Sequence, residues 1–150
     1  EELAKKYALA PYTMFIGSGA LWGETILFSM CILEEMQWKR TRYITSADFF
    51  HGTLELVEPG VPVFLFMGED ENRKLDERVR AFLTRGVTGD TDINVIDTAE
   101  FAIPGLDDEF RVIVSPWILT VLVTDRLARY YETVTKHNLK YRRYYHQFDY

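Results

Sequence analysis

The segment Val61–Met67 (VPVFLFM) constrains the fold more than any other part of the sequence. It is the most hydrophobic run in the chain, and turn residues bound it, with Glu58-Pro59-Gly60 before it and Gly68 after it. A strand that is apolar on both faces must be covered on both sides, which is typical of a central strand in a parallel sheet. Pro62 is compatible with this position because it stands near the start of the strand.

Three other short runs predict strands, and helical patterns separate them. The further strands are expected at Thr13–Ile16, Arg42–Thr45 and Ile93–Ile96. Helices are expected at 1–10, 20–38, 71–85 and 117–137, with a short helix after Ser46. Strands that alternate with helices form a parallel sheet with helices on both faces. The sequence therefore predicts a three-layer α/β domain with four to five strands.

Three features of the helices and of the tail have consequences for packing. The helix expected over 20–38 is apolar around most of its circumference, so it should be buried on more than one side. Pro116 is expected to divide the helical pattern that begins at Asp107. The segment 138–150 is too aromatic for a solvated tail and should pack on another part of the protein. Its pair Arg142-Arg143 indicates packing or anion binding at a subunit surface.

Composition limits the partners and the compartment. A net charge of -6 argues against a nucleic-acid-binding protein, which needs clustered Lys and Arg. No apolar run reaches the roughly 18 residues of a membrane span, and the N-terminus lacks a signal-peptide pattern. The single cysteine, Cys31, fits a reducing compartment, so we expect a cytoplasmic protein. The sequence starts inside a helical pattern, which indicates a piece of a longer chain.

The first candidate site is Gly17-Ser18-Gly19, between a predicted strand and a predicted helix. Backbone N–H groups at a helix N-terminus can bind phosphate, so Ser18 and Gly19 are candidates for contact with a phosphorylated small molecule. The spacing is G-x-G-x-x-x-G, and no acidic residue ends the second strand at Thr45, so a nicotinamide site is not favoured. A tight turn without a ligand explains the pattern equally well.

Two further candidates are Glu35 and His51. Glu34 and Glu35 come near the end of an apolar helix, where one should face solvent and the other the buried side. A partly desolvated carboxylate suits general-base catalysis, although two surface acids explain the pattern better. His51, in FFHGT, can present a ring that exchanges protons near neutral pH, but a packed or surface histidine is as good an explanation. The three histidines lack ligand spacing, so no metal is expected.

Taken in order, these elements resemble the sugar isomerase (SIS) domain. The resemblance rests on a strand, G-S-G, a long helix ending in glutamate, a second strand and the run SADFFHGTLELVEPGVPVFL. It is strongest over Phe15–Met67, and it is closest to the second SIS domain of glucosamine-6-phosphate synthase and of the fructosamine-6-phosphate deglycases. Glu35 falls on the glutamate of that family and His51 on its histidine. A flavodoxin-type sheet with the SIS arrangement is implied.

The chain departs from the synthase in ways that favour the deglycase branch. Thr53 stands where the synthase has proline, and Asp48 stands where the preceding acid is usually glutamate. The terminal sequence YRRYYHQFDY is unlike that of the synthase and similar to that of the deglycases.

The resemblance implies a deglycase that acts on a 6-phosphofructosamine-amino acid, such as the asparagine or aspartate adduct. Glu35 would move a proton between C1 and C2, and the resulting imine would be hydrolysed to glucose 6-phosphate and a free amino acid. His51 would open the sugar ring. No metal or organic cofactor is implied.

The resemblance also implies how the active site is assembled. Residues 1–150 would form a single SIS domain, the C-terminal half of a chain with two such domains. The first domain would hold most of the phosphate, so Ser18 need not touch it. Active sites would be shared across a homodimer, and the isolated domain would be folded, dimeric and nearly inactive. The alternatives are a phosphosugar-binding regulatory module, an aldose-ketose isomerase and a synthase-type isomerase.

Overall fold

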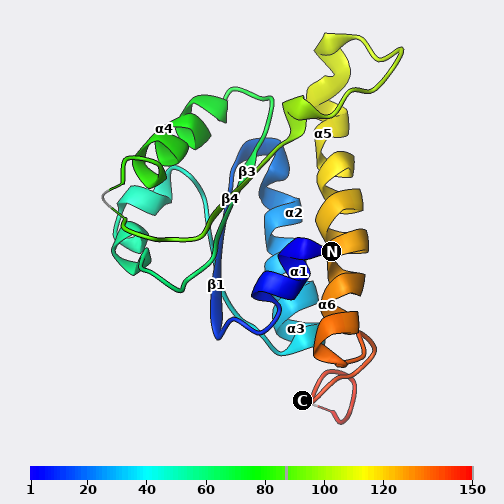
Figure 1. The fold of residues 1–150 in the computed structure, drawn as a ribbon. Coiled ribbons are helices and arrows are strands. Elements are labelled where there is room, and N and C mark those ends of the chain that lie inside the picture. The colour runs from blue at the N-terminus through cyan, green and yellow to red at the C-terminus, as the bar shows by residue number, and fades with distance from the viewer. Residues whose placement is uncertain (87, 150) are drawn as a thin grey trace.

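The computed structural model describes residues 1–86 and 88–149, and its centre is one parallel sheet (Figure 1). The strand order is β2-β1-β3-β4. The strands are β1 (Tyr12–Gly17), β2 (Arg40–Ile44), β3 (Val63–Met67) and β4 (Ile93–Asp97). Ile16 of β1 lies opposite Ile44 of β2 and Leu65 of β3. This order is of flavodoxin type, and it confirms the expected parallel sheet, with four strands in the part of the chain described.

Helices cover both faces of the sheet (Figure 1). On one face lie α1 (Glu2–Tyr7) and two long helical segments. The first segment comprises a 3₁₀ turn (Gly19–Leu21), α2 (Trp22–Ile26), a π-type stretch (Leu27–Glu34) and α3 (Glu35–Gln37). The second comprises α5 (Arg111–Leu119), a π-type stretch (Thr120–Leu127) and α6 (Ala128–Thr135). On the other face lie α4 (Arg73–Leu83) and 3₁₀ turns at Asp48–Phe50 and Thr53–Leu56.

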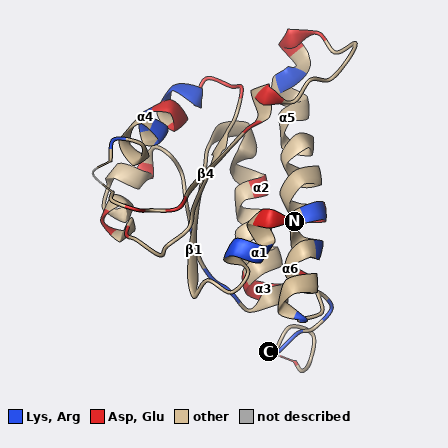
Figure 2. Ribbon diagram, viewed as in Figure 1, with Lys and Arg blue, Asp and Glu red and all other residues tan. Residues whose placement is uncertain are grey.

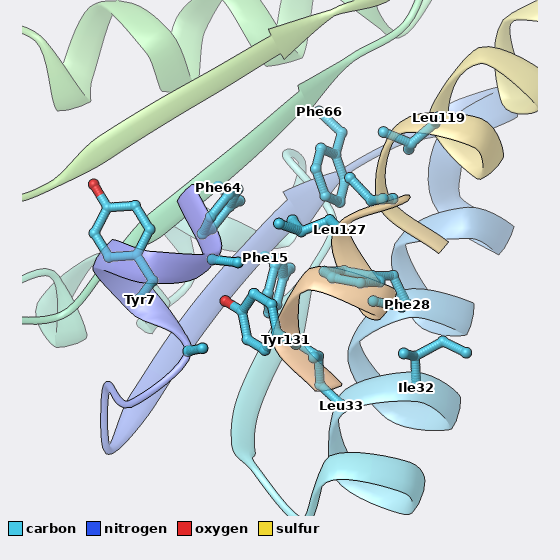
Figure 3. Packing of buried hydrophobic residues seen from close by; sticks show 14 of the residues in the cluster. Tyr7, Phe15, Phe28, Ile32, Leu33, Phe64, Phe66, Leu119, Leu127 and Tyr131 are labelled. Carbon is cyan, nitrogen blue, oxygen red and sulfur yellow. The ribbon is translucent and has the colours of Figure 1, made fainter. Parts of the chain in front are cut away.

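Aromatic rings fill the core between the sheet and the two long helical segments (Figure 3). The Phe15 ring of β1 lies 5.2 Å from the ring of Phe64 and 5.4 Å from that of Phe28, which comes from the first segment. Phe28 also meets Tyr131 of α6 edge-on. The first segment is therefore buried against both the sheet and the second segment, as its apolar circumference predicts.

A second core lies under the opposite face of the sheet. Met14, Ile16 and Leu65 point into it from the strands, and Val79 of α4 and Phe49 of the first 3₁₀ turn close it. All five side chains are fully buried. Because β1 and β3 contribute to both cores, the apolar run that begins at Val61 behaves as a central strand should.

The prediction that Pro116 divides the last helical pattern is wrong. α5 runs through Pro116 without a break and continues into α6. Proline has no N–H to donate to the carbonyl of Val112, four residues earlier. The hydroxyl of Ser115 donates to that carbonyl at 3.1 Å instead, so the acceptor is satisfied and the helix continues. Within the described residues, no helix is long and apolar enough to cross a membrane.

The tail folds back against the end of α3. α3 ends at Gln37, and the next residue, Trp38, has a left-handed φ of 53°, an uncommon conformation for a residue with a side chain. The ring of His137 lies 4.3 Å from the Trp38 ring, and the Arg143 guanidinium also lies 4.3 Å from it. The tail therefore packs on the domain as expected, although its rings at Tyr144 and Phe148 stay exposed. Residue 150 lies outside the described residues.

Candidate active site

The candidate residues lie at two opposite edges of the sheet. The first long helical segment begins after the carboxyl end of β1 and runs back along the sheet, so its last turn, at Glu35, lies beside the start of β2. Glu35 is therefore at the amino edge. Ser18 follows β1 and Ser46 follows β2, and both lie at the carboxyl edge, as expected from the direction of the strands.

A buried hydrogen-bond network occupies the carboxyl edge. The N–H of Ser46 donates to the Ser18 hydroxyl oxygen at 2.8 Å, and the Ser46 hydroxyl donates to Asp76 Oδ1 at 2.5 Å. The N–H of Gly68 donates to Asp76 Oδ2 at 3.3 Å. Burial raises the pKa of Asp76 to about 6, although both hydrogen bonds oppose the shift. The network ties the ends of β1, β2 and β3 to α4.

A carboxylate of the chain itself caps the helix after Gly17-Ser18-Gly19. The N–H of Ala20 donates to Asp70 Oδ2 at 2.5 Å. Gly19 has a left-handed φ of 53°, and a side chain there would collide with the Asp70 carboxylate. Substrate binding by Ser18 and Gly19 stays a prediction, and an incoming phosphate would have to displace Asp70 to use this amide.

At the amino edge, Glu35 forms an ion pair with the tail. Arg142 Nε lies 2.8 Å from Glu35 Oε1, and 33% of the Glu35 side chain is exposed. Arg142 Nη1 also donates to the carbonyl oxygens of Leu139 and Tyr141, at 2.8 and 2.9 Å. These bonds fix the guanidinium against the tail backbone, so Arg142 restricts where the Glu35 carboxylate can point.

The neighbouring acid, Glu34, has a different partner. The hydroxyl of Thr41, on β2, donates to Glu34 Oε1 at 2.6 Å. The sequence predicted that one of the two acids faces solvent and the other the buried side. Instead, both Glu34 and Glu35 are half-buried, and each has its own partner. The difference arises because β2 and the tail approach the helix end from two sides.

A cavity of about 390 Å³ lies between the end of α3 and the tail. Figure 2 shows the acidic turn of α3 and basic stretches of the tail at the same end of the molecule. The charged side chains that line the cavity are Glu34, Glu35, Lys39, Arg142 and Arg143. With three cations against two carboxylates, the cavity has an excess of positive charge and suits an anionic ligand.

His51 does not line this cavity within the same chain. Its side chain is exposed, and its 3₁₀ turn packs through Phe49 into the core under the α4 face of the sheet. Glu35 belongs to the helical segment on the opposite face, where Leu33 and Met36 pack. In the described part of the chain, no hydrogen bond or ion pair joins Glu35 and His51. One chain therefore presents the two candidate residues on opposite faces of its sheet.

Sequence reasoning missed Arg142 as the partner of Glu35 and missed Asp70 and Asp76 altogether. The pair Arg142-Arg143 stood out as an anion-binding candidate, but nothing in the sequence connects it to a residue more than 100 positions earlier. Asp70 lies in the loop after the buried strand β3, and Asp76 lies in the first turn of α4, the helix that follows this loop. Their position just after a buried strand is the signal that could have placed them at the carboxyl edge. Among the described residues, no group of three His, Cys, Asp or Glu side chains could hold a metal ion.

Comparison with known proteins relates the chain to deglycases. It is 33% identical over 136 residues to fructosamine deglycase FrlB of Bacillus subtilis, a match that covers 89% of this chain and 39% of that protein. It is 35% identical over 116 residues to the fructoselysine 6-phosphate deglycase of Escherichia coli strain K12, covering 75% of this chain and 31% of the relative. No protein-family model matches the chain.

Solved structures agree on the fold. A candidate phosphosugar isomerase of Bacillus subtilis matches with a TM-score of 0.88 at 29% identity, covering 99% of this chain and 44% of the other. The chain has an SIS-like fold. A more distant structure shares only the fold. It is the C-terminal domain of glucosamine-fructose-6-phosphate aminotransferase from Francisella tularensis, which is 13% identical and has a TM-score of 0.61, covering 92% of this chain and 40% of the other.

Homologues of this SIS-like domain include fructosamine and fructoselysine 6-phosphate deglycases. The domain spans 39% of the Bacillus subtilis relative and 31% of the Escherichia coli relative. The activity of those whole proteins therefore involves residues that have no counterpart in this domain. The resemblance drawn from Phe15–Met67 is confirmed.

Proposed function

We propose that this domain is part of a deglycase that acts on a 6-phosphofructosamine-amino acid, such as the asparagine or aspartate adduct. The observation that carries the proposal is the position of Glu35. Its carboxylate lines a cavity with an excess of positive charge and is oriented by Arg142. The homology to two deglycases supports the same reaction class.

The proposed reaction needs one base that reaches two neighbouring carbons. In the open-chain substrate, C1 carries the amine and C2 is a ketone. Glu35 removes a proton from C1 and an enolamine forms; returning the proton to C2 leaves a C1=N imine. Water then adds to C1, the C–N bond breaks, and glucose 6-phosphate and the free amino acid leave. A carboxylate in a half-buried cavity suits this shuttle, and no metal or cofactor enters any step.

His51 is the proposed acid-base group that opens the sugar ring. Since Glu35 and His51 lie on opposite faces of one sheet, we propose that each active site takes Glu35 from one subunit and His51 from the other subunit of a homodimer. The exposed position of His51 supports this arrangement, because its ring is open to a partner. The domain by itself would be folded, dimeric and nearly inactive. A second SIS domain of the same chain would hold the phosphate.

Product analysis of the full-length protein tests the reaction. With 6-phosphofructose-asparagine as substrate, we expect glucose 6-phosphate and free asparagine in equal amounts. Glu35→Gln should lower kcat by about 10³-fold or more, because it removes the base. The matched control is Glu34→Gln, whose carboxylate is held by Thr41. Unchanged turnover in Glu35→Gln would exclude Glu35 as the base.

Mixing two inactive variants tests the shared site. Glu35→Gln and His51→Asn each remove one residue, so each homodimer should be inactive. After subunit exchange, about half the dimers are mixed and each mixed dimer has one intact site, so activity should return to about a quarter of wild type. No recovery, with exchange confirmed by mass spectrometry, would place both residues in one chain's site.

Two other functions give different results in the same assay. A phosphosugar-binding regulatory module would bind the substrate and release no product. An isomerase of the aldose-ketose or synthase type would convert the sugar without releasing an amino acid. The deglycase is favoured because the cavity combines a positioned carboxylate with cations, whereas a module that only binds an anion has no need of Glu35. We also propose a cytoplasmic location.

A further inference from the structure

Two cationic side chains that line the cavity beside Glu35 have no role in the proposed chemistry. Arg142 is committed to Glu35 and to two carbonyl oxygens. Lys39 and Arg143 line the same cavity, and within the described residues neither side chain has a hydrogen bond or an ion pair to an acid. Lys39 is half-buried and Arg143 is exposed at the rim of the cavity. Two cationic side chains without an acidic partner, beside a positioned carboxylate, are candidates for ligand binding.

The Arg143 side chain and the Lys39 backbone are held in place by their surroundings. The Arg143 guanidinium lies 4.3 Å from the centre of the Trp38 ring, which supports its plane by a cation–π contact. Lys39 follows Trp38, and its N–H donates to the carbonyl of Leu33 at 2.9 Å, so the backbone there is fixed to the helix end. Burial lowers the pKa of the Lys39 ammonium, so a bound anion would relieve a cost that the free domain bears.

We propose that Lys39 and Arg143 bind the α-carboxylate of the amino-acid part of the substrate. This inference rests on the proposed function, because it takes Glu35 as the base at C1. The amine nitrogen is bonded to C1, and the α-carboxylate is two bonds further on. The phosphate is on C6, at the far end of the sugar chain. A substrate that presents C1 to Glu35 therefore brings its carboxylate, and not its phosphate, to the cations next to Glu35.

Charge balance supports the same assignment. An α-carboxylate close to C1 would be repelled by the Glu35 carboxylate that has to approach C1. Arg142 offsets the charge of Glu35 itself, and a further cation is needed for the substrate's own charge. Arg143 can contact a carboxylate with two parallel N–H groups, which fixes the direction of the amino acid as well as its charge.

The test compares two substrates of the full-length protein that differ only in the carboxylate. One is the 6-phosphofructose adduct of asparagine, and the other is the adduct of 3-aminopropanamide, which is asparagine without its carboxylate. Wild type should prefer the first in kcat/KM by about 100-fold. Arg143→Gln and Lys39→Gln should each reduce this ratio by about 10-fold or more, the usual weight of a hydrogen bond to a charged group. Arg143→Lys should keep part of it.

The control is Arg129→Gln on α6, whose side chain is 74% exposed and pairs only with Asp125 among the described residues. It should leave the ratio unchanged. If Arg143→Gln lowers kcat/KM equally for both substrates, the residue has a merely structural role and the inference is wrong.

A binding measurement separates this inference from the proposed function. Forms of both adducts reduced at C2 cannot lose the C1 proton through an enolamine, so calorimetry reports binding even where no turnover exists. The carboxylate should lower the Kd about 100-fold in wild type, and Arg143→Gln should remove most of that gain. Equal Kd values with and without the carboxylate would overturn the inference. The inference would also be overturned if Arg143→Gln weakened binding of the phosphorylated analogue and left binding of the dephosphorylated analogue unchanged, because Arg143 would then bind the phosphate. Carboxylate-dependent binding without deglycase turnover would overturn only the proposed function.

Discussion

The two edges of the sheet use similar polar residues in opposite ways. At the carboxyl edge, Ser18, Ser46 and Asp76 are at most 5% exposed and satisfy one another. At the amino edge, Glu35 and Arg142 pair at the wall of an open cavity. Parallel α/β sheets usually bind ligands at their carboxyl edge. In this domain the described polar groups of that edge are satisfied by one another, and the proton transfer we propose for Glu35 lies at the other edge.

The difference shows that a polar cluster has to be judged by its unsatisfied groups. A network whose donors and acceptors all find partners stabilises the fold, because breaking it leaves buried groups unpaired. A pair that borders solvent contributes little stability but can contact a ligand. Substitutions at the carboxyl edge should therefore change the free energy of unfolding, and substitutions at the amino edge should change catalysis.

The largest effect on stability is expected for Asp76→Ala. It leaves the Ser46 hydroxyl and the Gly68 N–H without their acceptor in a buried site, which should lower the free energy of unfolding by about 3 kcal/mol. Urea unfolding measures it. The control is the neighbouring Glu77→Gln, whose side chain is 59% exposed and pairs with Arg73 at 3.4 Å, where we expect less than about 1 kcal/mol. An unchanged Asp76→Ala midpoint would contradict the structural role of this edge.

The next largest effect is expected for Gly19→Ala, which should lower the free energy of unfolding by about 2 kcal/mol. The new side chain meets Asp70 and holds a left-handed φ of 53° that favours glycine. Thermal unfolding measures the loss, and adding Asp70→Ala should recover the part due to the collision. Gly23→Ala is the matched control: it lies in α2 with open space around it, and should stabilise the helix by about 0.5 to 1 kcal/mol. A loss at Gly23 as large as at Gly19 would refute the argument.

Arg142→Met should show most clearly that substitutions at the amino edge affect catalysis more than stability. Without its partner the Glu35 carboxylate is free to rotate, so kcat of the full-length protein should fall about 10-fold, or about 1.4 kcal/mol of barrier. Stability should fall less than in Asp76→Ala, because the ion pair borders solvent and the two carbonyl oxygens that Arg142 also contacts belong to the tail. Arg142→Lys should recover part of kcat. If KM rises while kcat stays, Arg142 contacts the substrate and does not act as a positioning residue.

The smallest effect is a pH dependence from Asp76. Burial raises its folded pKa to about 6, above the ordinary value of 3.8. For an acid, a raised folded pKa gives stability that is fully present below the unfolded pKa and is lost as pH rises through the folded pKa. The Tm advantage of wild type over Asp76→Asn should therefore shrink between pH 4 and pH 7. An advantage that grows over this range would reverse the sign and contradict the burial argument.

The sequence predicted most of the fold because its signals are local. The alternation of short apolar runs with helical patterns placed the four strands within a few residues, and Val61–Met67 identified the sheet's centre. It failed at Pro116, where the compensating bond comes from Ser115, the neighbouring residue. The sequence shows that proline lacks an N–H. Whether the Ser115 hydroxyl replaces that donor depends on its rotamer, which only the folded helix fixes.

The candidate site was predicted only in part. Glu35 and His51 were found as isolated residues and joined by a family resemblance, and their catalytic roles stay predictions. Arg142 was noted for its charge, but its contact with Glu35 depends on how the tail turns after α6. Sequence reasoning did not identify Asp70, although its carboxylate accepts a hydrogen bond at the helix N-terminus that Gly17-Ser18-Gly19 predicted.

By itself, the sequence determined the sheet, its two covered faces and the position of Ser18 at the carboxyl edge, because periodicity and strand direction fix these. Only the tertiary structure decided which polar groups are satisfied. Ser18 became a buried acceptor and Glu35 the partner of a distant arginine because the chain brought remote segments together. Whether a polar side chain stabilises the fold or remains available for chemistry depends on those partners, and local sequence does not contain them.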